Sequence, residues 1–399
     1  MNDTAHDELG RVLDLLTTKI TEDERTLGVS FPYVTAPDGN WQTMLASKSA
    51  GYDGEAWSHG NWFCGFWVGL LLAAHQHSGR QDLLDVARER MRLVAQRAAD
   101  GNTHDIGFIF WSSAVPLFRI FGEPIDREIA LEAAGRLRSR IVTTPAGAYV
   151  SSWGPLDDPR GRASSAIDTM ANIPLLYWAA EQARDESFFL AGESHARMTE
   201  RAFLRPDGTM YHAVEYDGRT GARRRGYTFQ GYADESSWSR GTGWAVYGYA
   251  ATAAATGQQR YLDLAMSLAE TWLRQLGGKA CPPWDFTDPA ESPTEDSSAG
   301  AIMAAALLDI GMLHPDPKVR EHWTAQGIRL LLGLAREYLA TEPGHRGLLK
   351  HGCYSKPHNI GADAAVMFGD YYFVEAIARI LFPGKLSPAH RPLAQSPAV

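Results

Sequence analysis

The stretch Phe63-Cys-Gly-Phe-Trp-Val-Gly-Leu-Leu-Leu-Ala-Ala74 is apolar along its whole length, and an amphipathic run over 82–100 follows it. A helix that is apolar all round is buried, whereas an amphipathic helix keeps one face in water. The alternation recurs, for example in 244–255 followed by 261–275. Inner helices that alternate with outer helices predict an all-α fold, an α/α barrel of helical hairpins. A solenoid of hairpins would share this pattern, but the sequence shows no fixed repeat period.

Helical periodicity covers most of the chain, while strand signals are sparse. No linker, low-complexity run or break in composition divides the sequence, so we expect one domain over residues 1–399. Only the proline-rich tail after about Pro383 is expected to be loose. The segments predicted to be helical are 8–21, 62–77, 81–99, 106–121, 127–141, 165–184, 187–201, 236–256, 259–276, 297–313, 319–339 and 361–381.

The charge of the chain excludes several partners. The formal net charge is −9, from 38 basic and 47 acidic residues, and no long Lys/Arg block occurs. Neither nucleic acid nor an anionic membrane is therefore an expected partner. The one basic cluster, over 223–225, is expected to be a solvated loop. Three well-separated cysteines and the lack of a signal peptide or of an apolar run of ~20 residues predict a cytoplasmic protein.

The segment Tyr232-Ala-Asp-Glu-Ser-Ser-Trp238-Ser-Arg240-Gly-Thr-Gly-Trp244 combines indole rings with an arginine. An aromatic wall beside a fixed cation is suited to a sugar ring that bears a carboxylate. The alternative for each tryptophan is ordinary core packing at a helix start. The chain holds 12 tryptophans, several of them beside Gly, Asp, Ser or Arg, which favours sugar binding.

Two carboxylates stand before very apolar helical runs: Asp105 and Asp168. Helix capping is the simpler interpretation of each one. The functional interpretation is that burial raises the carboxyl pKa into the range of a general acid. His212 and Gln230 lie in the least helical part of the chain, where they are either loop hydrogen-bonders or site residues. No metalloprotease, phosphate-loop or serine-hydrolase motif is present.

These motifs resemble the unsaturated glucuronyl hydrolases, a family of glycoside hydrolases with an (α/α)6 barrel of six helical hairpins. The resemblance implies release of the 4,5-unsaturated uronic acid from the non-reducing end of lyase-generated oligosaccharides, of the glycosaminoglycan type, without a cofactor. The resembling segments, in family order, are Trp62-Phe-Cys-Gly-Phe-Trp-Val-Gly, His104-Asp-Ile-Gly-Phe, Ile167-Asp-Thr-Met-Ala-Asn-Ile-Pro-Leu-Leu-Tyr-Trp, Gln230-Gly-Tyr-Ala-Asp-Glu-Ser-Ser-Trp-Ser-Arg-Gly, Pro283-Trp-Asp-Phe, Asp296-Ser-Ser-Ala and Gly369-Asp-Tyr-Tyr.

The resemblance also implies roles. Asp168 matches the family's proton donor and water-activating base, and Asp105 matches a second essential carboxylate. Relatives that favour sulphated fragments carry a Ser-x-x-Ser-x-Lys motif; here Lys356 is kept as a cation but the serine spacing is not. The residues that match the sugar subsite are Trp62, His104, Trp153, His212, Gln230, Trp238, Arg240 and Trp244.

Three other functions remain open at the level of sequence. An unsaturated rhamnogalacturonyl hydrolase would share the barrel and the reaction class but act on pectin fragments; the His212 and Gln230 matches favour the glucuronyl branch. An α/α-barrel epimerase would rely on histidine bases rather than on Asp105 and Asp168. A sugar-binding protein without activity is disfavoured, because buried unpaired carboxylates are costly. The sequence leaves the polysaccharide source and the oligomeric state open.

Overall fold

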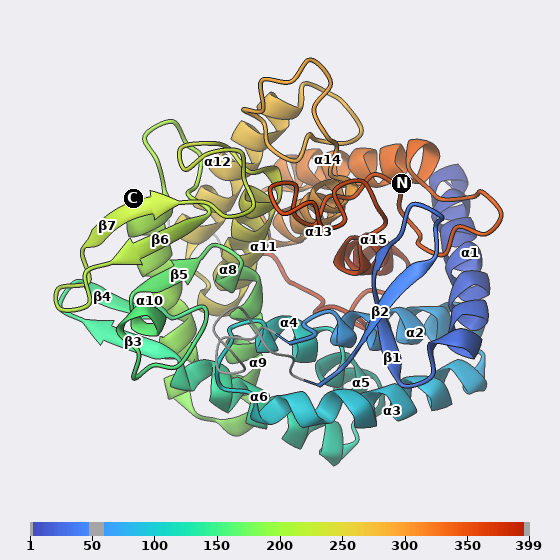
Figure 1. Cartoon of the computed structure of the whole chain (residues 1–399), viewed down its shortest axis with the longest axis horizontal. Helices are drawn as coiled ribbons and strands as arrows, with labels where there is room; N and C mark the ends of the chain where they lie inside the picture. The colour runs from blue at the N-terminus through green and yellow to red at the C-terminus, as the bar shows by residue number, and fades with distance from the viewer. Residues whose placement is uncertain (1–2, 48–59, 395–399) are drawn as a thin grey trace.

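The computed structural model, which describes residues 3–47 and 60–394, is an (α/α)6 barrel (Figure 1). The outer ring of helices consists of α1 (Asp3–Leu27), α3 (Gln81–Ala95), α6 (Pro124–Ser139), α10 (Glu186–Phe203), α12 (Gln259–Leu276) and α14 (Pro317–Glu337). The inner ring consists of α2 (Cys64–Ser78), α4 (Ile106–Trp111) with α5 (Ala114–Phe121), α8 (Thr169–Asn172) with α9 (Pro174–Ala183), α11 (Ser239–Thr256), α13 (Ser297–Leu313) and α15 (Met367–Leu381). Helix α15 contacts both α13 and α2, which closes the inner ring.

Small residues allow the inner helices to pack closely. A Cβ on Gly107 of α4 would lie 2.5 Å from Asn172 Cβ at the end of α8, and one on Gly248 of α11 would lie 2.2 Å from the carbonyl oxygen of Met170. Either contact would force the helices apart, since interiors are packed as densely as organic crystals. Glycine at these positions therefore sets the spacing between α4, α8 and α11.

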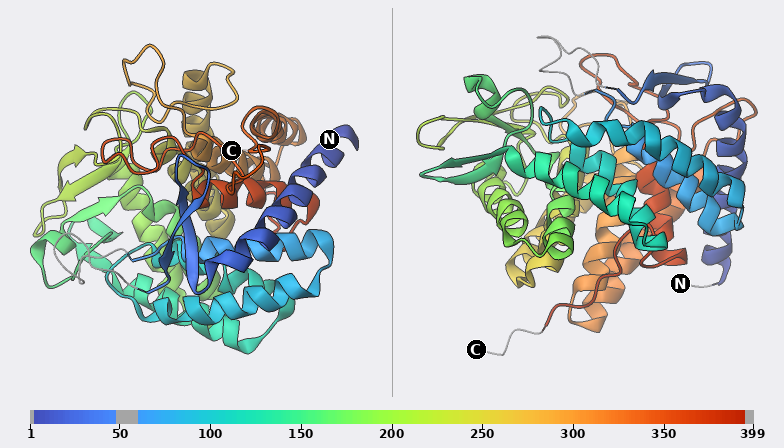
Figure 2. Two further views of the ribbon diagram at one scale, coloured as in Figure 1. Left: turned by 45° about the vertical axis from the view of Figure 1, so that its right-hand side comes forward. Right: turned by 90° about the horizontal axis from the view of Figure 1, so that it is seen from below.

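Short antiparallel strands lie on the loops at one end of the barrel. They form the pairs β1 (Ser30–Thr35) with β2 (Trp41–Leu45), and β3 (Ile141–Thr144) with β4 (Gly147–Val150), and the three-stranded sheet of β5 (Ser164–Ala166), β6 (Ala213–Tyr216) and β7 (Arg223–Tyr227). In the right-hand view of Figure 2, the β1–β2 hairpin lies at the upper end of the barrel and both chain termini lie at the lower end. The upper end is where the inner helices begin.

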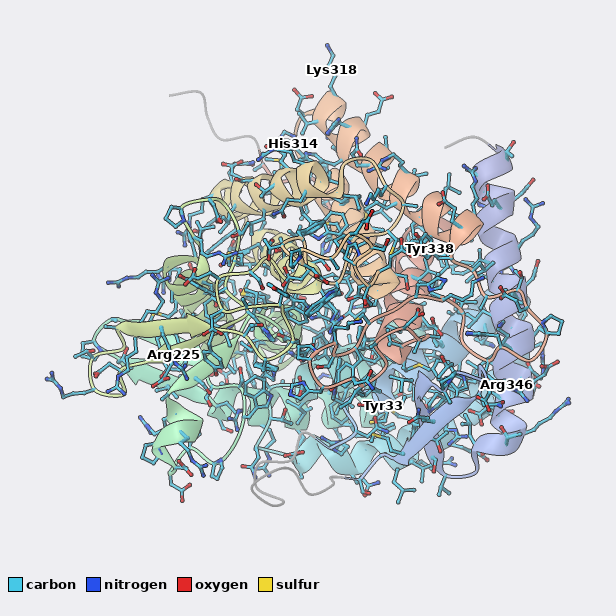
Figure 3. The ribbon with its side chains drawn as sticks, turned by 45° about the horizontal axis from the view of Figure 1, so that its top comes forward. Tyr33, Arg225, His314, Lys318, Tyr338 and Arg346 are labelled. Atoms are coloured by element: carbon cyan, nitrogen blue, oxygen red, sulfur yellow. The ribbon has the colours of Figure 1, made fainter. Side chains whose placement is uncertain are left out.

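The predicted helices are largely confirmed, with four differences. The predicted segment 106–121 is split at Ser112 and Ser113, and 165–184 begins as strand β5 before α8. Residues 361–366 precede α15 without helical structure. The basic cluster is not a loop: it forms the exposed strand β7, with Arg225 at the edge of the molecule (Figure 3) and paired with Glu215 of β6. The pairing of these arginines with β6, which includes Glu215, was not visible in local sequence.

The chain after α15 packs against the barrel as far as Leu393. Leu386 and Leu393 are buried, and the amide nitrogen of Leu393 donates a hydrogen bond to the carbonyl oxygen of Leu313 (2.8 Å). The guanidinium of Arg119 donates to the carbonyl oxygen of Leu386 (3.1 Å). This segment lies across the C-terminal ends of the inner helices, and the looseness expected after about Pro383 stays a prediction. Within the described ranges, no helix is both long and apolar enough to cross a membrane.

Candidate active site

Both candidate carboxylates lie at the upper end of the barrel, each directly before an inner helix. Asp105 is the residue before α4 and Asp168 the residue before α8, and neither side chain makes the hydrogen bond of a helix cap. The amide nitrogen of Ile167 donates to the carbonyl oxygen of His212 (2.8 Å), which continues the β5–β6 pairing up to the site. Simple capping therefore does not explain either carboxylate, and the strand pairing brings His212 beside Asp168.

Asp168 is mostly buried, with 14% of its side chain exposed, and its buried Oδ2 atom has no hydrogen-bond partner. His212 Nε2 lies 3.8 Å from this Oδ2 atom, and that nitrogen also has no hydrogen-bond partner. Burial raises the pKa of Asp168 to about 6; His104 and Arg240 lower the pKa, and the negative charge of Asp105 raises it further. A carboxyl group with such a pKa is partly protonated near neutral pH, as a general acid requires.

Asp105 is held in place by its neighbours. Thr103 Oγ1 donates to Asp105 Oδ2 (2.9 Å), and His104 Nε2 lies 3.2 Å from Asp105 Oδ1. The other ring nitrogen of His104, Nδ1, forms a hydrogen bond of 2.5 Å with the hydroxyl of Thr169, the first residue of α8. The imidazole of His104 therefore links the carboxylate before α4 to the helix that follows Asp168.

A buried asparagine joins the same two helices. Asn172 Oδ1 accepts a hydrogen bond from the amide nitrogen of Phe108 in α4 (2.5 Å), and its Nδ2 donates to the carbonyl oxygen of Asp168 (3.0 Å). Together with the close contact at Gly107, these bonds fix how α4 and α8 are placed relative to one another. Asn172 and His104 therefore both connect the start of α4, after Asp105, with the start of α8, after Asp168.

His212 lies in an aromatic environment that favours its neutral form. Its Nδ1 forms a hydrogen bond with the hydroxyl of Thr228 (2.8 Å), and its ring lies 4.0 Å from that of Phe229 and 4.2 Å from that of Trp238. Burial, with the charge of Arg240 next in size, holds the pKa of His212 well below its ordinary value. A neutral imidazole can exchange hydrogen bonds with a substrate without adding a charge beside Asp168.

Arg240, which the sequence predicted as a fixed cation, is held by four hydrogen bonds from its terminal nitrogens. Its Nη1 donates to Asp296 Oδ2 (2.5 Å) and to the carbonyl oxygen of Cys353 (2.5 Å). Its Nη2 donates to Gln230 Oε1 (2.6 Å) and to the carbonyl oxygen of Tyr354 (2.6 Å). The terminal nitrogens are thus occupied, so the guanidinium positions its neighbours. Because arginine only donates, Gln230 must present its oxygen to Arg240, which leaves its amide nitrogen for another partner.

Three of the predicted tryptophans line the site. The guanidinium of Arg240 lies 4.7 Å from the ring of Trp238, as expected for an aromatic wall beside a cation. Trp62 is half-buried and stacks on Phe368 (centroids 5.3 Å apart), and Trp153 is half-buried with its ring edge-on to His104 (5.4 Å). Aromatic faces of this kind suit the apolar C–H faces of a sugar.

Trp244 and Lys356 lie differently from the other predicted residues. Trp244 is completely buried in α11 and packs against Phe108 (4.9 Å) and Tyr372 (5.0 Å), so it has no exposed face for a sugar and supports the site from behind. Lys356 is exposed on the loop that follows Tyr354, and it forms no ion pair within the described part of the chain.

The described residues contain no group of three or more His, Cys, Asp or Glu residues placed to hold a metal ion.

Sequence reasoning assigned no role to three residues that organise the site: Thr169, Asn172 and Asp296. Asp296 is completely buried and holds Arg240, while its Oδ1 accepts hydrogen bonds from Ser298 and from the amide nitrogen of Cys353. All three lie inside quoted family segments, which was a usable signal. Their partners lie far away in the sequence, so the specific bonds could not be predicted.

Comparison with known proteins gives consistent relatives. The chain is 33% identical over 365 residues to the unsaturated glucuronyl hydrolase of Bacillus sp. (strain GL1), covering 89% of this chain and 92% of that protein. It is 29% identical over 326 residues to an unsaturated chondroitin disaccharide hydrolase of Streptococcus pneumoniae, covering 80% and 81% of the two chains. No protein-family model matches the chain.

The solved structures agree with these relatives. The unsaturated glucuronyl hydrolase of Bacillus sp. GL1 superposes with a TM-score of 0.82 at 28% identity, covering 95% of this chain and 96% of that one. An unsaturated glucuronyl hydrolase specific for heparin superposes with a TM-score of 0.83 at 26% identity, covering 95% and 98%. With the identity to its relatives extending over most of both chains, this protein belongs to the unsaturated glucuronyl hydrolase family of glycoside hydrolases.

Proposed function

We propose that this enzyme removes the 4,5-unsaturated uronic acid from the non-reducing end of lyase-generated glycosaminoglycan oligosaccharides, with Asp168 as general acid and base. The observation that carries the assignment to Asp168 is its buried Oδ2 atom, which has no partner and belongs to a carboxyl group with a pKa of about 6. An unpaired buried carboxylate lowers stability, and such groups are characteristic of sites that use them.

The reaction is a hydration of the C4=C5 enol ether. Protonated Asp168 gives its proton to C4, and the positive charge that results is shared by C5 and the ring oxygen. The Asp168 carboxylate then takes a proton from a water molecule, whose oxygen bonds to C5. The hemiketal formed in this way opens and releases the remaining saccharide, while Asp168 has regained its proton.

Asp105 has two effects on this sequence. Its negative charge raises the pKa of Asp168 and so keeps the acid protonated before the reaction. Once C4 has been protonated, the same charge stabilises the nearby cation electrostatically. The hydrogen bonds from Thr103 and the link through His104 hold the carboxylate still for both purposes.

The substrate carboxylate is proposed to bind at Gln230 and His212 rather than at the terminal nitrogens of Arg240. Arg240 fixes the oxygen of Gln230, so the amide nitrogen of Gln230 is left to donate. His212 Nε2 is buried, without a partner, and faces Asp168. Lys356 is an exposed cation on the loop that follows Tyr354. It is proposed to contact a more distant part of the saccharide, and no sulphate site is proposed there. The relatives named for chondroitin and for heparin leave both substrate types open to this chain.

The test follows the ultraviolet absorbance of the conjugated C=C–carboxylate during incubation with unsaturated disaccharides. The substrates are sulphated and unsulphated chondroitin, hyaluronan, heparin and rhamnogalacturonan products. Decay with the uronyl disaccharides of glycosaminoglycans, absent in Asp168→Asn, is the expected result, and the ranking identifies the preferred donor. Decay with the rhamnogalacturonan product alone would contradict the proposed substrate class, and equal decay in Asp168→Asn would contradict the proposed acid.

We also propose a cytoplasmic location. Cys64, Cys281 and Cys353 are all free and buried, and burial raises the pKa of each thiol. Free thiols in a large enzyme are typical of a reducing compartment. Fractionation of the cells that produce the protein tests this, and recovery from the medium or the periplasm would contradict it.

A further inference from the structure

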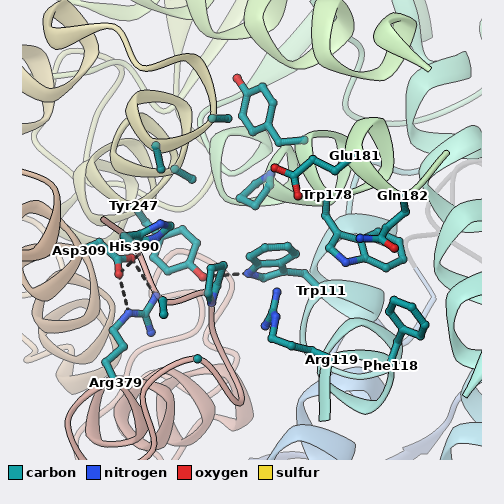
Figure 4. Close-up of a pocket in the computed structure, with 18 residues that line it drawn as sticks. Trp111, Phe118, Arg119, Trp178, Glu181, Gln182, Tyr247, Asp309, Arg379 and His390 are labelled. Atoms are coloured by element: carbon teal, nitrogen blue, oxygen red, sulfur yellow. Dashed lines mark hydrogen bonds and ion pairs between the residues drawn. The ribbon is translucent and has the colours of Figure 1, made fainter. Parts of the chain in front are cut away.

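A cavity lies at the opposite end of the barrel from Asp105 and Asp168. It has a volume of about 450 Å³ and is lined by the C-terminal parts of α5, α9, α11, α13 and α15, together with the segment that follows α15 (Figure 4). Ligand pockets commonly fall in the range of ~300–1,000 Å³. Its volume, and a lining that includes both charged and aromatic side chains, set it apart from a packing defect.

One wall of the cavity carries a cation without a carboxylate partner. Arg119, in the last turn of α5, lies with its guanidinium 5.6 Å from the ring of Trp111 and donates only to the carbonyl oxygen of Leu386. Within the described ranges, no carboxylate lies at ion-pair distance from it. Burial is the main cause that lowers the pKa of Arg119 below its ordinary value, since nearby negative charge does not fully offset desolvation.

The carboxylates near Arg119 are already engaged. Asp309 accepts two hydrogen bonds from Arg379 (2.8 and 2.9 Å), and Glu375 lies 2.8 Å from another nitrogen of the same guanidinium. His390, from the segment after α15, lies 3.7 Å from Asp309, and burial lowers its pKa. The remaining carboxylate of the lining, Glu181, is exposed at the rim.

Aromatic side chains face this cation. Trp178 and Phe118 pack edge to face with centroids 6.1 Å apart, and Tyr177 continues the same wall along α9. Figure 4 shows Trp111 and Arg119 between this aromatic group and the group formed by Tyr247, Asp309 and Arg379. A flat or ring-shaped ligand with a carboxylate would stack on the aromatic wall and form charge-assisted hydrogen bonds with Arg119.

We propose that this cavity is a second ligand site, separate from the catalytic one, that binds a small carboxylate carried on a ring. A uronate monosaccharide and an aromatic acid both have this chemistry. The segment 384–390 forms one side of the site, so it would contact the ligand as well as cover apolar surface.

Titration calorimetry tests the site on the full chain with D-glucuronate and with benzoate, and with glucose and benzyl alcohol as their uncharged counterparts. Loss of a charge-assisted hydrogen bond is worth roughly 1.5–3 kcal/mol, so Arg119→Met should weaken binding of the acid by about tenfold or more. Arg92→Met removes an exposed arginine in the last turn of α3 and should leave the affinity unchanged. Turnover of the unsaturated disaccharide should be the same in both variants.

Either acid binding better than its uncharged counterpart supports the site, and the preferred acid tells a uronate site from an aromatic-acid site. No binding of either acid, or equal affinity in Arg119→Met and in wild type, overturns the proposal. If Arg119→Met does not fold, Glu181→Gln decides the matter. At low ionic strength, where an exposed charge is little screened, removing that negative charge should strengthen acid binding about twofold, and an unchanged affinity would then overturn the proposal.

Discussion

Buried carboxylate oxygens at the two ends of the inner helices differ in whether they have a partner. At the lower end, Asp309 and Glu375 share the guanidinium of Arg379 through contacts of 2.8–2.9 Å. At the upper end, Asp168 Oδ2 has no hydrogen-bond partner, and His212 Nε2 lies 3.8 Å away. A paired buried carboxylate is part of the framework, whereas an unpaired one reduces stability and is retained for chemistry. Substitutions at the two ends should therefore have opposite consequences.

The largest expected effect is on catalysis at the upper end. Asp168→Asn keeps the shape of the side chain but can neither give nor take the proton, and general acid–base groups contribute about 10²–10⁴-fold. Because Asp168 is proposed to serve in both steps, we expect kcat to fall by about 10³-fold or more. The measurement is the rate of absorbance decay at saturating disaccharide. A loss of less than tenfold would mean that another group supplies the proton.

The matched substitution at the lower end is Asp309→Asn, which should act on stability instead. It breaks a buried pair and weakens the neutralisation of Arg379, so we expect the free energy of unfolding to fall by about 3 kcal/mol. Urea denaturation measures this change, and kcat per folded molecule should stay within about twofold of wild type, as for a site distant from the chemistry. A folded variant with a large loss of turnover would show that the two ends are coupled, and the contrast drawn above would fail.

Asn172 separates positioning from chemistry at the upper end. Asn172→Ala removes the bond from Phe108 that ties α4 to α8 and the bond to the carbonyl oxygen of Asp168, and a displacement of ~1 Å at a catalytic group costs about 10²-fold in rate. We expect kcat to fall by about 10- to 100-fold with little change in KM. Ser112→Ala is the control, since the Ser112 hydroxyl donates to the carbonyl oxygen of Phe108 (2.7 Å) without contacting α8. Equal losses in the two variants would indicate a general packing defect rather than a change in carboxylate spacing.

The sequence predicted the helices, and the end of the barrel at which the carboxylates lie, better than it predicted contacts between side chains. Apolar and amphipathic periodicity located nearly all of the helices, and the position of Asp105 and Asp168 before apolar runs placed both at the same end of the barrel. Periodicity says which face of a helix is buried but not how deeply, so it could not distinguish the completely buried Trp244 from the half-buried Trp62. The pairing of Arg240 with Asp296 joins residues 56 positions apart and depends on the closed ring of helices.

The last prediction concerns how the stability of Asp168→Asn depends on pH, and it tests the contrast between the two ends directly. The folded-state pKa of Asp168 is about 6 against an ordinary value of 3.8, so the native state binds the proton more tightly than the unfolded state. Stability is therefore lost as pH rises between these two values, by about 2–3 kcal/mol in all, because one pKa unit corresponds to roughly 1.4 kcal/mol. Asn carries no charge, so Asp168→Asn should be more stable than wild type at about pH 7.5, and the difference should vanish below about pH 4. Urea denaturation across this pH range measures the gap. If the variant were no more stable at the higher pH, the folded protein would stabilise the ionised Asp168 carboxylate as well as it stabilises that of Asp309. Burial would then give no reason to assign Asp168 a catalytic role.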